Sequence, residues 1–427
     1  MGDTLFEEIF ARVNEMEVID THEHIMNKEL VMQEKINLFK VFENSYAKLD
    51  FTSAGMPEEI WSDEDLKNIW SIFAKYQGKV HLTTIVKNII NSLKNLYGLE
   101  EDIITEKNYL ELSKRIEKAY QREDWYKSVL REKAKIRISL LDAFWSLDNL
   151  DFDKELFIPV LRANPFILGK NCNLPCVKSK FHHTTIEEIS KSWGINIDDF
   201  DSYLYLIETA FSKYRKLNSP AIKIATAYQR PLYFKNIQRK AAKTIFEKSP
   251  LKQSCDEKKD LQDFMAHYFI QKATNEGMVV QIHTGTFARN GAIINNGNPE
   301  QLNNLFLEYP NTKFSLFHFS YPYTNQVFCL AKMFPNVVLN FCWVPMISEN
   351  FAKKSFNEFL DLIPYNKIMW GGDSYRVEEA YGGSCLFRKV ISAVLSERVK
   401  QKSINKEMAI QIAQDILFNN AREYYSL

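Results

Sequence analysis

Short apolar runs alternate with helical patterns along most of this chain, and this alternation limits its fold more than any other feature. Eight runs have the length and composition of buried strands, and they begin near residues 17, 136, 157, 221, 278, 313, 337 and 367. Strands separated by helices and short connections are typical of a parallel sheet. Eight such units predict an α/β fold, a (β/α)8 TIM barrel formed by residues 1–427 as a single domain. An open doubly wound sheet is the alternative, but neither a Gly-x-Gly-x-x-Gly turn nor a P-loop supports it.

Residues 26–132 interrupt this alternation. The region contains long helical patterns, such as the one from Val86 to Tyr97, and many aromatic residues. Gly98 directly follows that pattern, and a glycine in this position is a common helix C-terminal signal. The next strand pattern begins only at Ile136. We therefore predict a helical insertion, residues 26–132, after the first strand of the barrel.

The charge balance limits the partners of this chain. It has 54 basic and 54 acidic side chains, so its formal net charge is zero. A neutral chain gives no electrostatic reason to expect nucleic acid or an anionic membrane as a partner. No apolar run reaches the roughly 18 residues of a transmembrane helix, and the N-terminus lacks the pattern of a signal peptide. We expect a cytoplasmic protein that acts on a small-molecule substrate, and a homo-oligomer is compatible with the sequence.

Histidines stand at the ends of several predicted strands. His22 and His24 end the first strand, and residues i and i+2 of an extended chain point to the same face. His283 and His318 end the fifth and sixth strands, and Asp373 follows the eighth. A closed barrel would bring all five side chains together above its C-terminal opening, where barrel active sites lie.

These residue types are suited to metal chemistry. Three imidazoles and one carboxylate can hold a divalent ion with a position left open for water, and such an ion lowers the pKa of that water to about 7. A single histidine at a strand end is more often a hydrogen-bonded structural residue, and Asp373 after two glycines could be a turn residue. Four of the eight histidines lie at predicted strand ends, however, so we interpret the group as a metal site.

Longer motifs give a more specific indication. They occur in order along most of the chain, and they resemble the amidohydrolase superfamily, in its metal-dependent (β/α)8 branch. Within it, the sequence is similar to the amidohydrolase-like domain that is fused to glutamine synthetase-like enzymes. The motifs are Ile19 to His24 (IDTHEH), Asn95 to Gly98 (NLYG), Lys223 to Pro231 (KIATAYQRP), Gln281 to Gly285 (QIHTG), Asn298-Pro299, His318 to Tyr323 (HFSYPY) and Gly372-Asp373.

The resemblance implies roles for the residues at the strand ends. His22, His24 and His283 would be metal ligands. His318 would either bind a second ion or handle a proton. Asp373 would be a ligand, or the base that orients an attacking water. The implied cofactor is a divalent metal, zinc being the expected ion, with one or two ions per chain.

Lys223, in the fourth strand, has three interpretations. Binuclear relatives carry a carboxylated lysine at this strand, which bridges two metals. Its ammonium group could instead bind a substrate anion. It could also simply reach solvent past the end of the strand.

Three other residues are candidates for binding substrate: Arg162, Arg230 and Tyr321. Arginine pairs with a carboxylate in a bidentate fork, and both arginines follow predicted strands. The family pattern usually has arginine directly after Ala-Tyr, where this chain has Gln229, so Arg230 is displaced by one position. Arg376, just after Asp373, is a further possibility.

We therefore expect a metal-dependent hydrolase that attacks a small carboxylated substrate through a metal-activated water. Asp373 would take the proton, and His318 would stabilise the developing charge. A decarboxylase or a uronate-isomerase-like reaction could use the same metal site. A non-enzymatic metal-binding regulatory protein is the second alternative.

Overall fold

Parallel strands form the centre of the structure. The computed structural model describes residues 4–169 and 183–427. Every strand pairing in this part of the chain is parallel. The strands are β1 (Val18–Glu23), β2 (Ile136–Leu141), β3 (Phe157–Pro159), β4 (Leu161–Arg162), β5 (Ala221–Ile224), β6 (Val279–Ile282), β7 (Phe314–Leu316), β8 (Val337–Asn340) and β9 (Ile368–Met369).

The strands close into a ring of eight. They pair in the order β1-β2-β3 and β4-β5-β6-β7-β8-β9, and only Val160 separates β3 from β4, which together act as one strand. The last strand returns to the first through backbone hydrogen bonds. The N–H of Thr21 donates to the carbonyl of Trp370 at 3.0 Å, and the N–H of Asp373 donates to that of His22 at 2.8 Å. The α/β class and the parallel sheet predicted from the sequence are confirmed.

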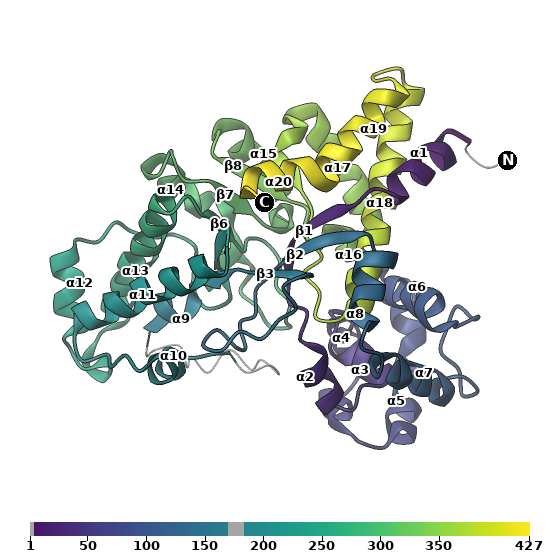
Figure 1. The fold of residues 1–427 in the computed structure, drawn as a ribbon, viewed down its shortest axis with the longest axis horizontal. Helices are drawn as coiled ribbons and strands as arrows, with labels where there is room; N and C mark the ends of the chain where they lie inside the picture. Colours follow the sequence, from purple (N-terminus) through teal and green to yellow (C-terminus); the bar gives the residue numbers. More distant parts are fainter. Residues whose placement is uncertain (1–3, 170–182) are drawn as a thin grey trace.

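Helices surround this ring and connect most of its strands (Figure 1). They begin and end at local signals in the sequence. In α13 (Cys255–Asn275), Ser254 and Glu257 form a capping box, and Gly277 follows the end with φ +68°. Such a cap satisfies backbone N–H groups that have no partner inside the helix. The other helices outside the β1–β2 connection are α1 (Thr4–Asn14), α9 (Asn164–Leu168), α10 (Ile186–Trp193), α11 (Phe200–Lys216), α12 (Arg239–Phe246), α14 (Asn303–Glu308), α15 (Thr324–Met333), α16 (Val344–Ile347), α17 (Glu349–Leu362), α18 (Val377–Lys400), α19 (Lys406–Gln414) and α20 (Asn420–Tyr425).

The connection from β1 to β2 consists of helices and loops, and Figure 1 shows its helices gathered on one side of the strands. Aromatic side chains hold this region together, with Phe73 in ring contact with Phe39, Phe42 and Phe51. It is joined to the rest of the fold where α6 packs on α18. Its helices are α2 (Lys28–Gln33), α3 (Leu38–Glu43), α4 (Ala47–Ser53), α5 (Leu66–Val80), α6 (Thr84–Tyr97), α7 (Tyr109–Tyr120) and α8 (Trp125–Lys127). No described helix is long and apolar enough to cross a membrane.

A small apolar cluster fills one end of the barrel. Strand residues such as Ile19, Leu140 and Val279 pack there against Tyr425 of the last helix, α20. The side-chain amide of Gln281 donates to the hydroxyl of Tyr425 at 2.9 Å. Because α20 closes this end, the opposite end, where the strands terminate, is left for a functional site.

Replacing Tyr425 tests whether this closure stabilises the barrel. Tyr425→Ala removes a side chain that is only 3% exposed, and this creates a cavity. It also removes the hydroxyl to which the side-chain amide of Gln281 donates. We expect a loss of about 3–5 kcal/mol in the free energy of unfolding. Tyr205→Ala is the control, because Tyr205 on α11 is 62% exposed. Urea denaturation followed by circular dichroism measures both variants, and equal losses would show that α20 does not stabilise the barrel.

Candidate metal centre

Two strands that meet at the closure of the barrel bring together three potential ligands. His22 lies in β1, His24 directly follows it, and Asp373 lies in the loop after β9. The Nε2 atoms of His22 and His24 are 3.4 and 3.3 Å from Oδ1 of Asp373. The three donor atoms lie within 4.8 Å of one another, and all three side chains are buried.

The orientation of His24 fits a metal ligand. Its Nδ1 is 2.8 Å from the backbone carbonyl of Asp142, and its Nε2 faces the carboxylate of Asp373. Both partners can only accept a hydrogen bond, whereas a neutral imidazole carries one proton. With the proton on Nδ1, the lone pair of Nε2 faces Asp373, and a cation between these two atoms would bind both. A histidine that donates its second nitrogen to a carbonyl is the usual arrangement at metal sites.

A second pair of imidazoles shows the same feature. The Nδ1 of His318 is 3.0 Å from the carbonyl of Cys342, and the Nε2 of His283 is 2.8 Å from that of Thr286. The remaining nitrogens, Nε2 of His318 and Nδ1 of His283, face each other at 3.2 Å. If both rings donate to carbonyls, two lone pairs point at one another, and a bound cation would relieve the repulsion.

Electrostatics favour neutral rings and an ionised carboxylate. Burial lowers the pKa of His318 to about 4, and burial also holds the pKa of His22 and His283 well below the usual range. Burial would raise the pKa of Asp373, but its contacts with His22 and His24 hold it well below its usual range. Neutral imidazoles beside a carboxylate form the donor set that divalent transition metals prefer.

Asp373 connects the two groups of imidazoles. Its Oδ1 faces His22 and His24, and its Oδ2 is 3.7 Å from Nε2 of His318. The Sγ of Cys342 belongs to a second set of potential ligand atoms, in which His318, Cys342 and Asp373 lie within 4.8 Å of one another. The donor set therefore fits one ion at His22 and His24, and it offers further ligands on the side of His318.

Two buried carboxyl groups hold the joint between β1 and β9 beneath these ligands. Asp20 Oδ1 accepts from the N–H of Gly372 at 3.0 Å and from that of His22 at 3.1 Å. Glu23 Oε2 accepts from the N–H of Ser374 at 2.5 Å, so Glu23 is turned towards this joint. Burial and the neighbouring Asp20 raise the pKa of Glu23 well above its usual range. The pair therefore fixes the backbone on both sides of Asp373.

Lys223 lies inside the same site. It is only 1% exposed, and its Nζ is 3.3 Å from Nε2 of His22 and 3.2 Å from the ring centre of Phe317. The interpretation in which this lysine reaches solvent is therefore wrong. Burial lowers the pKa of Lys223 to about 7, and a carboxylate bound beside it would favour the ammonium form. Carboxylation and the binding of a substrate anion both remain compatible with this position.

The two arginines predicted to bind substrate are engaged in ion pairs. Arg162 is the register partner of Lys223 on the neighbouring strand, and its guanidinium pairs with the buried carboxylate of Asp142. Arg230 pairs with Asp263 on α13 and donates to the carbonyl of Tyr233 at 2.9 Å. The structure therefore places Arg162 beside the metal site, whereas the hydrogen bonds of Arg230 are to Pro231, Tyr233 and residues of α13.

Tyr321 and Arg376 do not take the expected positions. The strand predicted to reach His318 ends at Leu316, and a turn with positive φ follows it, so Tyr321 does not lie on a strand. Its ring packs against Phe351 of α17 at 4.8 Å. Arg376 is buried and donates to Glu34 at 2.6 Å. The strand is shorter than predicted, and the role of Tyr321 in binding substrate stays a prediction.

Sequence reasoning missed several aromatic residues around the site. Tyr228 lies within one of the sequence motifs and Tyr375 lies just after another, so the motifs could have indicated that both residues are near the site. Trp343, which has φ +61°, and Tyr46 lie outside these motifs, and their rings are 4.2 Å apart. Their proximity to the imidazoles depends on tertiary structure. The ring centres are 5.7 Å apart for Trp343 and His318, 5.4 Å for Tyr375 and His24, and 4.7 Å for Tyr228 and His283.

Comparison with known proteins supports the resemblance. A family model described as Amidohydrolase matches residues 250–427, the part that contains His283, His318 and Asp373. The chain is 32% identical over 178 residues to Protein fluG of Emericella nidulans. That alignment covers 40% of this chain and 20% of the relative, so it spans about a fifth of the length of that protein. The resemblance to the amidohydrolase family is therefore confirmed over residues 250–427.

Solved structures match the fold over the whole chain. A uronate isomerase from Thermotoga maritima has a TM-score of 0.79 at 16% identity, covering 100% of this chain and 98% of that one. A glucuronate isomerase from Caulobacter crescentus has a TM-score of 0.74 at 14% identity, covering 99% and 94%. A putative metal-dependent hydrolase from Lactobacillus casei has a TM-score of 0.67 at 15% identity, covering 98% and 97%. Identities this low establish the common fold and leave the reaction open.

Proposed function

We propose that this chain is a metal-dependent hydrolase of the amidohydrolase type, acting on a small carboxylated substrate. The observation that carries the proposal is the convergence of His22, His24 and Asp373 at the closure of the barrel, with their donor atoms within 4.8 Å of one another. A divalent ion, for which we propose zinc, would lower the pKa of a water molecule and polarise a substrate carbonyl.

The side chains of the site would have separate roles in this reaction. His22, His24 and Oδ1 of Asp373 would hold the ion. Oδ2 of Asp373 is turned towards His318 and would accept the proton that the attacking water loses. Oδ2 would then pass this proton to Nε2 of His318, 3.7 Å away, whose Nδ1 faces the carbonyl of Cys342. The protonated ring would donate a hydrogen bond to the oxygen on which charge develops. Proton transfer by a positioned group contributes about 10²–10⁴-fold to a rate.

Cationic side chains at one wall support a carboxylated substrate. Lys223 and Arg162 are register partners on β5 and β4, and both are buried beside the metal ligands. The carboxylate of Asp142 already compensates Arg162, so Lys223 is the cation that we assign to the substrate. If Lys223 is instead carboxylated, it would contribute an anionic ligand to the site.

Isomerisation of a sugar acid is the second candidate. The uronate isomerase structures cover nearly all of this chain, including the connection between β1 and β2, and this full-length agreement favours it. In that reaction, Asp373 and His318 would move a proton between neighbouring carbons, and no water would enter the product.

Product analysis separates the two reactions, once metal analysis has established the ion. We expect metal in the purified protein, and less in His22→Ala than in His81→Ala, a control on a histidine at the end of α5. Turnover of a panel of amides, lactones and uronates in H₂¹⁸O should add one labelled oxygen if the reaction is hydrolysis. A product of unchanged mass would favour isomerisation. A metal-free protein with full activity would refute both candidates.

A further inference from the structure

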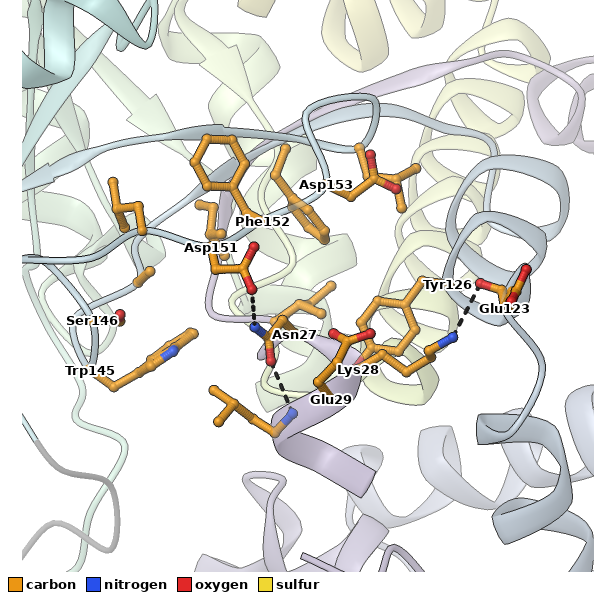
Figure 2. A pocket seen from close by; sticks show the side chains of 17 residues that line it. Asn27, Lys28, Glu29, Glu123, Tyr126, Trp145, Ser146, Asp151, Phe152 and Asp153 are labelled. Atoms are coloured by element: carbon orange, nitrogen blue, oxygen red, sulfur yellow. Dashed lines mark hydrogen bonds between the residues drawn. The ribbon is translucent and has the colours of Figure 1, made fainter. Parts of the chain in front are cut away.

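A cavity lies on the outer side of the barrel, where a helix would normally cover the strands. Residues 142–156, all described, connect β2 to β3 without forming a helix. In a (β/α)8 barrel, each strand is ordinarily followed by a helix that packs on the outer face. Here a loop, the residues around α2 and part of α8 cover the face instead, and they leave a cavity of about 180 Å³ (Figure 2).

The inner wall of this cavity is apolar and aromatic. Leu141, Leu156 and Phe157 come from the strand side, and Trp145 and Phe152 come from the connecting loop. An engineered apolar cavity of about 150 Å³ accommodates benzene, so this space suits a body about the size of one aromatic ring.

The rim of the cavity has the opposite character. Four carboxylates line it, those of Glu29, Glu123, Asp151 and Asp153, against the single ammonium group of Lys28. That ammonium group donates to the backbone carbonyls of Arg122 and Glu123 at 3.1 and 3.4 Å. Figure 2 shows the carboxyl groups of Asp151 and Glu29 turned towards the space between the loop and α2.

Two of these carboxylates have neutral hydrogen-bond partners in the described part of the chain. Asp151 accepts from the side-chain amide of Asn27 at 3.4 Å, and Asp153 accepts from the N–H of Glu155 at 2.8 Å. Several like charges beside aromatic faces attract a cation, through charge complementarity and through the negative faces of the rings. An anion or a neutral polar molecule would gain neither interaction.

We propose that this cavity binds a small organic amine, whose apolar body lies between Trp145 and the strand wall and whose ammonium group lies at the carboxylate rim. The site is separate from the metal centre, since none of the metal ligands lines it. It is nevertheless close, because Ile25 and Ala143 of its lining directly follow His24 and Asp142 in sequence.

Isothermal titration calorimetry with 2-phenylethylamine tests the proposal. We expect saturable binding of the amine, weaker binding of the neutral isostere 2-phenylethanol, and no binding of 3-phenylpropionate. The affinity for the amine should fall about fivefold in Asp151→Asn, and it should also fall when ionic strength rises from about 0.02 to 0.2 M. Asp361→Asn on α17 is the control and should leave the affinity unchanged.

Two further variants locate the bound amine. Ala143→Leu fills the cavity and should abolish binding, provided that its melting temperature matches that of the parent protein. His22→Ala changes the metal centre and should leave binding intact. Equal affinities for the amine and the alcohol, full affinity in Asp151→Asn, absence of amine binding, or its loss in His22→Ala would each overturn the proposal.

Discussion

Asp373→Asn should reduce turnover by about 10³-fold or more, while the folded structure is retained. The substitution keeps the size of the side chain but removes its charge. Oδ1 of Asp373 faces Nε2 of His22 and His24, and Oδ2 faces His318, so one carboxylate serves both sides of the site. The amide nitrogen that replaces one oxygen can neither bind a cation nor accept a proton.

Metal content should change together with activity in this variant. We expect inductively coupled plasma mass spectrometry to find less metal per chain in Asp373→Asn than in the parent protein, after identical dialysis. Asp361→Asn is the matched control, because Asp361 lies on the surface of α17 and forms an exposed ion pair with Arg398 of α18. Full metal content with full activity in Asp373→Asn would show that neither binding nor catalysis depends on this carboxylate.

Local patterns were sufficient to predict the elements that position most of these ligands. The alternation of apolar runs and helices predicted eight parallel strands, and β3 with β4 accounts for the third of them. The end of α6 was predicted from Gly98, which caps this helix in the structure with φ +69°. Such signals succeed because they depend on capping and on burial on both faces of a strand, which are properties of neighbouring residues.

Contacts between distant segments were harder to predict. Arg230 was expected to face substrate, but it pairs with Asp263, which follows it by 33 residues. Tyr46, between β1 and β2, packs its ring against Trp343, which follows β8. The turn at His318, with three successive residues at positive φ, shortens a strand whose apolar pattern continues to Phe319. The positions of these side chains depend on packing between distant segments, which local sequence patterns do not predict.

Gly372→Ala should weaken metal binding about 10–100-fold, although Gly372 itself offers no ligand. A Cβ at this position would lie 1.9 Å from Oε1 of Glu23, so the carboxyl group would have to move. Its other oxygen, Oε2, accepts from the N–H of Ser374, and the backbone on both sides of Asp373 depends on these contacts. The expected effect therefore passes through Glu23 to the orientation of Asp373.

Two comparisons make this prediction specific. Gly383→Ala, on α18, places its Cβ at an ordinary 3.6 Å from Trp370, so it should leave metal affinity unchanged. Alanine in a helix interior is also favoured over glycine by about 1 kcal/mol. In a Glu23→Ala background, the carboxyl group that Gly372→Ala would displace is absent, so Gly372→Ala should cost little more. Competition with a chromophoric chelator measures the affinities, and an equal loss for Gly372→Ala with and without Glu23 would show that the effect does not depend on this carboxyl group.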